Sequence, residues 1–254
     1  MKPILLFMAA IPFISCSQPS ANVQPNSSID TIKKIFHTVN DIPLPGGFER
    51  IKAESNSFTG YLRNLKLKKD NTVYLYNGSP KRNQSAQYAV LDIPVPKVDL
   101  QQCADAVMRI RAEYLFGQKR FSEITFTDNA HGAYSFSPPY TKEHFDKYLL
   151  LVFANCGTAS LSKQLNEVKG YDNIEPGDVL IKGGSPGHAV IVMDAAINKE
   201  GKKAYMLAQS YMPAQDIHIL KNPKHPNSPW YFAENDNTIY TPEWVFYKDQ
   251  LKRW

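Results

Sequence analysis

A cysteine, a histidine and an amide side chain follow one another along this 254-residue chain in an order that suits thiol chemistry. Cys103 lies near the start of an expected helix, where free N–H groups and the positive end of the helix dipole favour a thiolate. His188 follows the turn-rich run 183–187 and begins an apolar strand. A histidine that reaches a thiol can remove its proton, so the pair predicts nucleophilic catalysis with His188 as the general base.

An expected hairpin supplies a residue that would orient the histidine. Residues 189–194 and 204–208 have the pattern of strands, with a turn near Asn198-Lys199 between them. Folding the chain about this turn brings His188 opposite Gln209 or Ser210, within one step of register. We therefore assign Gln209 as the residue that orients His188.

The same residues can also be interpreted without the proposed catalytic roles. Cys156, just before Gly157, is a second thiol, although a helix C-terminus disfavours the anion. Cys103 and Cys156 are also a possible disulfide in an oxidising compartment, and Cys103 alone would fit a small core position. His188 taken alone would fit an edge histidine that only satisfies a loop carbonyl.

Four further residues are candidates for contacts with a substrate. Arg111 lies near the cysteine face of its helix and would suit a substrate carboxylate, with a solvated helix face as the alternative. Ser210 and Tyr211 follow Gln209, and Trp230 would line a sugar or peptide groove unless it only packs at the rim. The remaining histidines have no metal-ligand spacing with acids or cysteines, so we expect no metal and no cofactor.

The elements that would hold these residues point to an α+β fold. Asp99 and Gln102 form a capping pattern for a helix that runs to about Phe116, with Gly117 after it. Helices early in the chain and an antiparallel sheet late in it are typical of the α+β class. Other expected helices begin at Ser28, Thr141, Thr158 and Thr241-Pro242-Glu243, and other expected strands cover 179–182 and 216–220.

The first residues predict export. Residues 4–14 are apolar but too short to span a bilayer, which fits an export signal. Phe13-Ile14-Ser15-Cys16 resembles a bacterial lipobox, which implies lipidation of Cys16; the alternative is a plain secretory signal cleaved nearby. We expect a signal peptide over 1–16, a flexible tether over 17–28 and a single domain over 29–254. The lipid would anchor the protein in the bacterial cell envelope, and the sequence does not specify which membrane leaflet.

The charge of the chain argues against a nucleic-acid partner. The net charge is +5, and no run of five or six like charges occurs. A basic stripe or patch would be expected for nucleic-acid binding.

Over residues 99–220 the order of motifs resembles the NlpC-type branch of papain-like cysteine hydrolases. The matching segments are the helix-start cysteine, Glu175-Pro176-Gly177-Asp178 before one strand, Gly187-His188 before the next, and a polar residue on a third. Gln102-Cys103-Ala104-Asp105 departs from the Asp-Cys-Ser-Gly usual in that branch. The resemblance implies a papain-like, NlpC-like fold with its catalytic core at about 99–220.

A second resemblance covers nearly the whole mature chain. Phe48-Glu49-Arg50, the segment 101–106, the segment 183–192 and the segment 208–215 are similar to an uncharacterised bacterial lipoprotein family, one of the domains of unknown function. This resemblance carries no assigned activity.

Together these patterns predict a lipid-anchored envelope protein that acts as a cysteine peptidase or amidase. The cell-wall peptide is the substrate that the NlpC-type resemblance implies. The alternative is a non-catalytic lipoprotein of the same fold that binds peptide or glycan.

Overall fold

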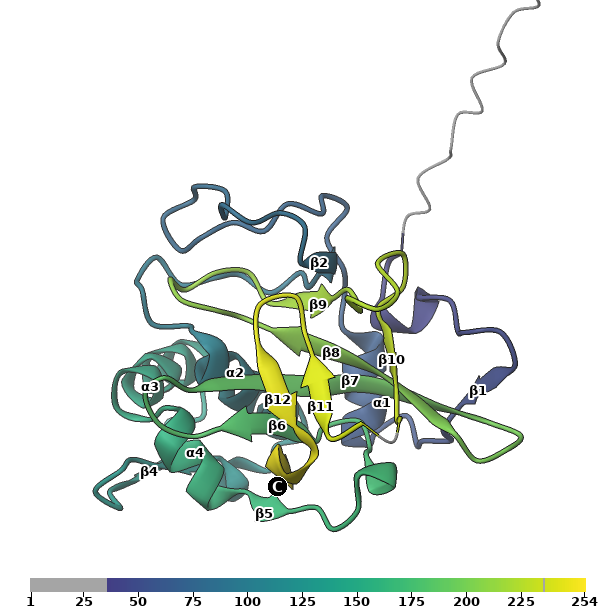
Figure 1. The fold of residues 1–254 in the computed structure, drawn as a ribbon. Helices are drawn as coiled ribbons and strands as arrows, with labels where there is room; N and C mark the ends of the chain where they lie inside the picture. Colours follow the sequence, from purple (N-terminus) through teal and green to yellow (C-terminus); the bar gives the residue numbers. More distant parts are fainter. Residues whose placement is uncertain (1–35, 235) are drawn as a thin grey trace, which may run out of the picture. The chain divides into compact units, whose positions relative to one another are not determined.

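An antiparallel sheet of nine strands organises the part of the chain that the computed structural model describes, which is residues 36–234 and 236–254 (Figure 1). Helices and strands alternate irregularly along the sequence, so the fold class is α+β as expected. The strand order is β2 (Gln87–Val90), β9 (His218–Leu220), β8 (Lys203–Gln209), β7 (His188–Asn198), β6 (Val179–Lys182), β13 (Leu251–Arg253) and β5 (Asn166–Glu167), while β1 (Phe48–Arg50) pairs with β7 and β10 (Trp230–Phe232) with β8.

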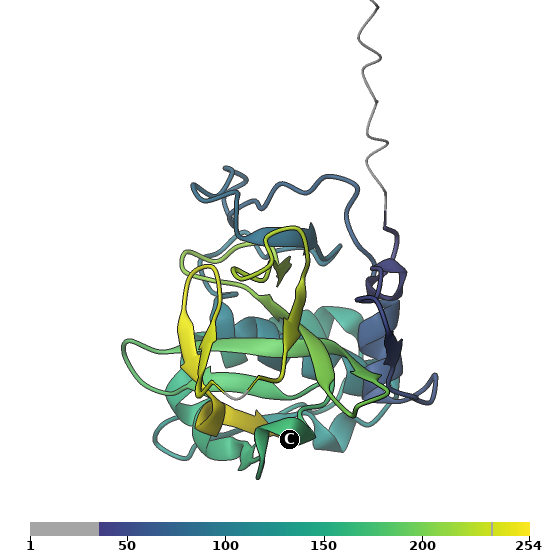
Figure 2. The ribbon, with the colours of Figure 1, turned by 45° about the vertical axis from the view of Figure 1, so that its right-hand side comes forward.

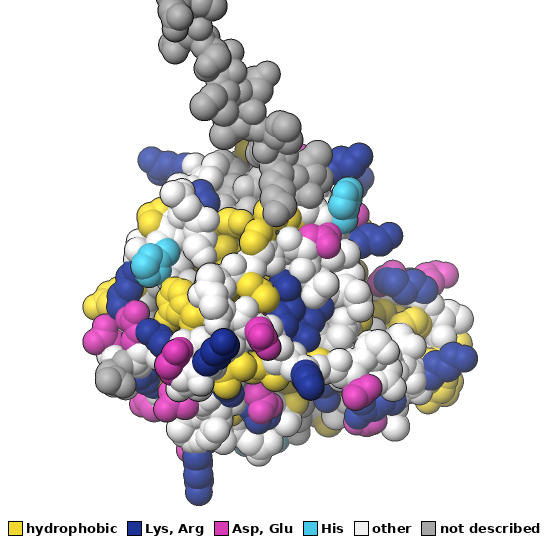
Figure 3. Space-filling view, turned by 90° about the vertical axis from the view of Figure 1, so that its right-hand side faces the viewer, with side chains coloured by type: hydrophobic (Ala, Val, Ile, Leu, Met, Phe, Trp, Pro, Cys, Tyr) yellow, Lys and Arg dark blue, Asp and Glu magenta, His cyan; other side chains and the backbone are white. Residues whose placement is uncertain are grey.

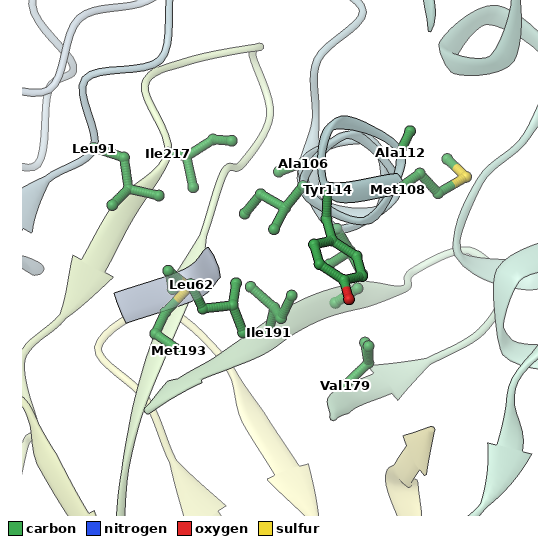
Figure 4. Packing of buried hydrophobic residues seen from close by; sticks show 14 of the residues in the cluster. Leu62, Leu91, Ala106, Met108, Ala112, Tyr114, Val179, Ile191, Met193 and Ile217 are labelled. Carbon is green, nitrogen blue, oxygen red and sulfur yellow. The ribbon is translucent and has the colours of Figure 1, made fainter. Parts of the chain in front are cut away.

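Both faces of the sheet are covered. Helices α1 (Phe58–Asn64) and α2 (Cys103–Gly117) pack behind β7, and the hairpin of β11 (Thr238–Tyr240) and β12 (Val245–Tyr247) lies in front (Figures 1 and 2). Figure 4 shows the helix side of this packing, where Leu62, Ile191 and Met193 meet. The remaining elements are α3 (Lys142–Asn155), α4 (Thr158–Gln164), β3 (Thr125–Thr127), β4 (Ala133–Ser135) and the short 3-10 turns at Val39–Asp41, Phe121–Glu123, Tyr171–Asn173 and Lys248–Gln250.

Strand β7 divides its side chains between these two faces. Ala189 and Ile191 belong to the helix-side core, whereas Val190 and Val192 belong to the core under the hairpin. Such alternation follows from the period of two in a strand. A bulge between Val192 and Asp194 then shifts the register of β7 against β8.

The start of α2 differs from its predicted position. Gln102 is the residue before the helix, Cys103 is its first residue, and the backbone N–H of Gln102 donates to Asp105 Oδ2 at 2.9 Å. Asp99 instead accepts hydrogen bonds from the Gln102 side chain and from the backbone of Ala214. The cysteine therefore stands at the very N-terminus of α2, where the N–H groups lack intrahelical partners.

The prediction of a closing helix that begins at Thr241 is wrong. The Thr241 hydroxyl accepts from the backbone N–H of Trp244, as a cap would, but the chain turns after this contact. Residues Val245–Tyr247 pair with β11, and Leu251–Arg253 pair with β6 and β5. A β-branched and aromatic segment gains more from pairing beside existing strands than from one local cap.

The expectations for the N-terminus fall largely outside the described residues. These are the signal peptide 1–16 with Cys16, the tether 17–28 and most of the helix expected over 29–39. At the described end of that helix, Val39–Asp41 form a 3-10 turn. Among residues 36–234 and 236–254, no helix is long and apolar enough to cross a membrane.

One face of the molecule shows how the charges are distributed. Basic and acidic side chains are interspersed over the described part of this face (Figure 3). Mixed charges of this kind do not build a large field of one sign.

A buried carboxylate joins β7 to the N-terminal segments. Asp194 is fully buried, and its two oxygens accept from Arg50 and Arg63, each at 2.7 Å. The backbone N–H of Ala195 adds a third hydrogen bond at 2.9 Å. This cluster connects β1 and α1 to the strand that carries His188.

Candidate functional site

A cleft of about 510 Å³ opens at the end of the sheet where β7 begins. This volume lies within the range of small-ligand sites. Cys103, His188 and Tyr211 all line the cleft, together with Asp99, Leu100, Gln102, Ala104, Asp105, Phe153, Cys156, Gly157, Thr158, Gly184, Ser185, Pro186, Gly187, Met212 and Trp244. The turn-rich run before His188 therefore contributes residues 184–187 to the wall of the cleft.

Cys103 reaches the cleft because α2 begins there. Its side chain is buried, and burial raises the pKa of the thiol above its usual value. The backbone amide of Ala189 acts in the opposite direction and lowers this pKa, as do the amides of Ala104 and of Cys103 itself. These donors would favour a developing thiolate at the helix start.

His188 is buried at the first position of β7. Nε2 of its ring lies 2.9 Å from Oε1 of Gln209. Burial lowers the pKa of His188 to about 4, while the hydrogen bond with Gln209 works against the shift. The ring is therefore neutral at pH 7 and is able to accept a proton.

The contact between His188 and Gln209 matches the neighbour predicted from the hairpin. Ile191 pairs with Ala208, and continuing this register places Val190 opposite Gln209. The contact with His188 is therefore diagonal across the two strands, which a long amide side chain can span.

Cys103 and His188 approach the cleft from different faces of the sheet. The His188 ring packs against Trp244 and Phe246 on the hairpin side, with centroids 5.2 and 5.8 Å apart, whereas α2 covers the other side. Because His188 stands at the strand's end, both residues still line one cleft. Among the described residues, no hydrogen bond joins the sulfur to the ring, and none reaches Nδ1 of His188.

A buried polar network behind Gln209 was not predicted. The amide nitrogen of Gln209 donates to Glu243 Oε2 at 2.7 Å and lies 3.4 Å from Nε2 of His218. Glu243 also accepts from Lys81 and Asn83. These partners come from loops and from one short strand, and Thr241-Pro242-Glu243 carried only the signal of a helix start. A buried lysine and a glutamate near the site have no periodic pattern that would reveal them.

The other predicted contact residues separate into one that lines the cleft and three that do not. Tyr211 lines it, and its ring lies 4.8 Å from that of His188. Ser210 is fully buried and donates to backbone carbonyls, while the Trp230 indole donates to Pro43. Arg111 lies over the rings of Phe58, Tyr114 and Trp254. A contact with a substrate in this cleft is not available to these three side chains as placed.

Both described cysteines are free thiols. Cys103 and Cys156 line the same cleft without a disulfide between them, which contradicts the alternative of a structural pair. Burial, followed by the charges of Asp128 and Asp105, raises the pKa of Cys156 to about 11. Among the described residues, no group of three histidine, cysteine or acidic side chains is placed to hold a metal ion.

The two buried histidines predict a loss of stability in acid. Burial lowers the pKa of both His188 and His218 from 6.5 to about 4. Below pH 6.5 the unfolded chain binds protons that the folded chain does not bind, so stability falls as the pH drops from 6.5 to about 4. The loss is on the order of 3 kcal/mol for each histidine.

Urea unfolding across this pH window measures the effect. We expect His188→Gln and His218→Gln each to flatten the dependence of the unfolding free energy on pH. His225→Gln, which alters an exposed histidine, serves as the control and should leave it unchanged. An unchanged slope in both buried-site variants would contradict the assignment.

The described fold and site define an α+β domain with a cysteine and an amide-paired histidine in one cleft. The family model named "Domain of unknown function (4846)", DUF4846, matches residues 39–138 and 128–253, and the chain belongs to this family. No curated protein and no solved structure matches the chain. The expected membership in a domain-of-unknown-function family is thus confirmed.

Proposed function

We propose that this protein is a thiol-dependent hydrolase of amide bonds, in which Cys103 is the nucleophile, His188 the general base and Gln209 the residue that orients His188. One observation carries the proposal. The first residue of α2 and the first residue of β7 line the same cleft, and Nε2 of His188 is engaged by Gln209, which leaves Nδ1 without a partner among the described residues. A base needs a free lone pair that faces the cleft.

The residues supply each step of an acyl transfer. Nδ1 of His188 takes the thiol proton as the sulfur attacks the carbonyl carbon. The backbone N–H of Cys103 donates to the resulting oxyanion. When the C–N bond breaks, the leaving amine takes the proton from Nδ1, and a water molecule then hydrolyses the thioester with His188 again as the base.

The proposed substrate and location follow from the sequence resemblance. A papain-like, NlpC-like arrangement would make a peptide of the cell wall the substrate, and lipidation at Cys16 would hold the enzyme at a membrane of the envelope. The order of α2, β6, β7 and β8 along the chain supports the papain-like arrangement, and the volume of the cleft suits a small ligand.

A second candidate function is a lipoprotein that binds a peptide or glycan in the same cleft without cleaving it. The observation that favours it is the state of the thiol. Cys103 is buried, its pKa is raised, and it makes no hydrogen bond to His188 among the described residues.

A bifunctional alkylating reagent tests whether the two catalytic side chains can meet. We expect dichloroacetone to alkylate the Cys103 sulfur and then Nδ1 of His188, with loss of both chlorides, and to abolish cleavage of cell-wall peptides. Peptide mapping by mass spectrometry would detect the cross-link, and His188→Gln would yield only a single alkylation. Alkylation of Cys103 without a cross-link to His188 would contradict the proposed pair.

A further inference from the structure

The network behind Gln209 fixes which end of its amide faces His188. Burial raises the pKa of Glu243, but the hydrogen bond and charge of Lys81 outweigh this effect, so the pKa lies below its usual value and Glu243 is ionised at neutral pH. An ionised carboxylate only accepts hydrogen bonds. The atom of Gln209 that lies 2.7 Å from Glu243 must therefore be its NH2 group.

The second hydrogen of the Gln209 NH2 group has His218 as its acceptor. Nδ1 of His218 lies 2.9 Å from the backbone oxygen of Asp216, and a carbonyl oxygen only accepts. The proton of this neutral ring is therefore on Nδ1, and Nε2 presents a lone pair to the amide nitrogen of Gln209 at 3.4 Å. Both hydrogens of the NH2 group have an acceptor.

The carbonyl end of Gln209 must then face His188. Oε1 accepts at 2.9 Å, so Nε2 of His188 has to carry the ring proton. In a neutral imidazole the other nitrogen holds the lone pair.

We propose that Glu243, assisted by His218, is a positioning residue that locks the amide of Gln209 and thereby keeps the proton of His188 on Nε2 and its lone pair on Nδ1. The catalytic meaning of this lock rests on the proposed function, but the tautomer itself does not. Charge-assisted hydrogen bonds are the stronger kind, so Glu243 contributes more than His218 to the lock.

Lys81 explains how the chain keeps a carboxylate in this place. Its ammonium group pairs with Glu243, and only 9% of the Lys81 side chain is exposed. Removing one member would leave the other charge buried and unpaired, which is strongly destabilising. The appropriate variant is therefore Lys81→Met/Glu243→Leu, which removes both charges together.

The tautomer of His188 is the primary measurement. The protein contains 6 histidines, and in ¹⁵N-histidine spectra the signals lost in His188→Gln identify this ring. In the wild-type protein we expect Nε2 in the protonated range and Nδ1 in the unprotonated range. In Lys81→Met/Glu243→Leu the amide is free to turn, so we expect a second population with the proton on Nδ1.

Kinetics provide the second measurement. We expect kcat to fall roughly 10- to 100-fold in the double variant, by analogy with residues that orient a metal-bound histidine, with KM nearly unchanged. Lys147→Met/Glu143→Leu is the matched control, because it removes an exposed pair of the same residue types on α3. It should retain both the wild-type tautomer and the wild-type kcat.

The outcomes separate the lock from the proposed function. A wild-type tautomer in the folded double variant overturns the lock, whatever the activity. A mixed tautomer in a protein that cleaves no peptide supports the lock and refutes the proposed hydrolase. A mixed tautomer with a lowered kcat supports both.

Discussion

Cys103→Ala is expected to abolish the hydrolysis of cell-wall peptides, with a fall in kcat/KM of at least about a thousandfold. This substitution removes the sulfur, and no other protein group in the proposed mechanism attacks the carbonyl carbon. The side chain is small and stands at the first position of α2, so the fold should persist. Peptide cleavage followed by mass spectrometry, together with a thermal unfolding curve, measures both effects.

Cys156→Ala is the matched control for this substitution. Cys156 is also a buried free thiol that lines the cleft, but it is the C-cap residue of α3, whereas Cys103 is the first residue of α2. Burial raises its pKa to about 11, which disfavours its thiolate. We expect this variant to retain most of the activity. If Cys156→Ala loses activity and Cys103→Ala retains it, Cys156 is the nucleophile and the proposed role of Cys103 is wrong.

The same variant distinguishes the two candidate functions. A hydrolase that has lost its nucleophile should still bind the peptide, which calorimetry with Cys103→Ala would detect without turnover. If the wild-type protein binds the peptide equally well and never cleaves it, the binding lipoprotein is the correct function.

Asp194→Ala is expected to destabilise the folded domain by about 3–5 kcal/mol. The substitution leaves the guanidinium groups of Arg50 and Arg63 without the carboxylate that each contacts at 2.7 Å. It also removes the acceptor of the Ala195 backbone N–H. Urea unfolding at neutral pH would measure the loss.

Asp146→Ala provides the comparison for Asp194→Ala. Asp146 pairs with Lys142 along α3, and about half of its side chain is exposed. Exposed helix pairs contribute only about 0.3–0.5 kcal/mol. A loss as small as this in Asp194→Ala would show that the buried cluster does not hold β1 and α1 against β7.

Local periodicity and capping patterns were enough to predict several parts of this protein. Alternating strands and a turn near Asn198 were enough to predict that His188 and Gln209 are neighbours. The predicted start of the helix that carries Cys103 was correct within a few residues. The α+β class followed from the same patterns. Each signal is carried by neighbouring residues, so no tertiary information is needed to detect it.

Which side chains share the cleft depends on tertiary packing. Arg111, Ser210 and Trp230 have suitable chemistry, but packing turns them toward other aromatic rings or backbone carbonyls. Lys81 and Glu243 meet across 162 positions of the sequence. The segment after Thr241 pairs as strands because the sheet and hairpin offer partners that outweigh a local helix cap. Contacts between distant loops depend on the whole packed fold, and no pattern of nearby residues encodes them.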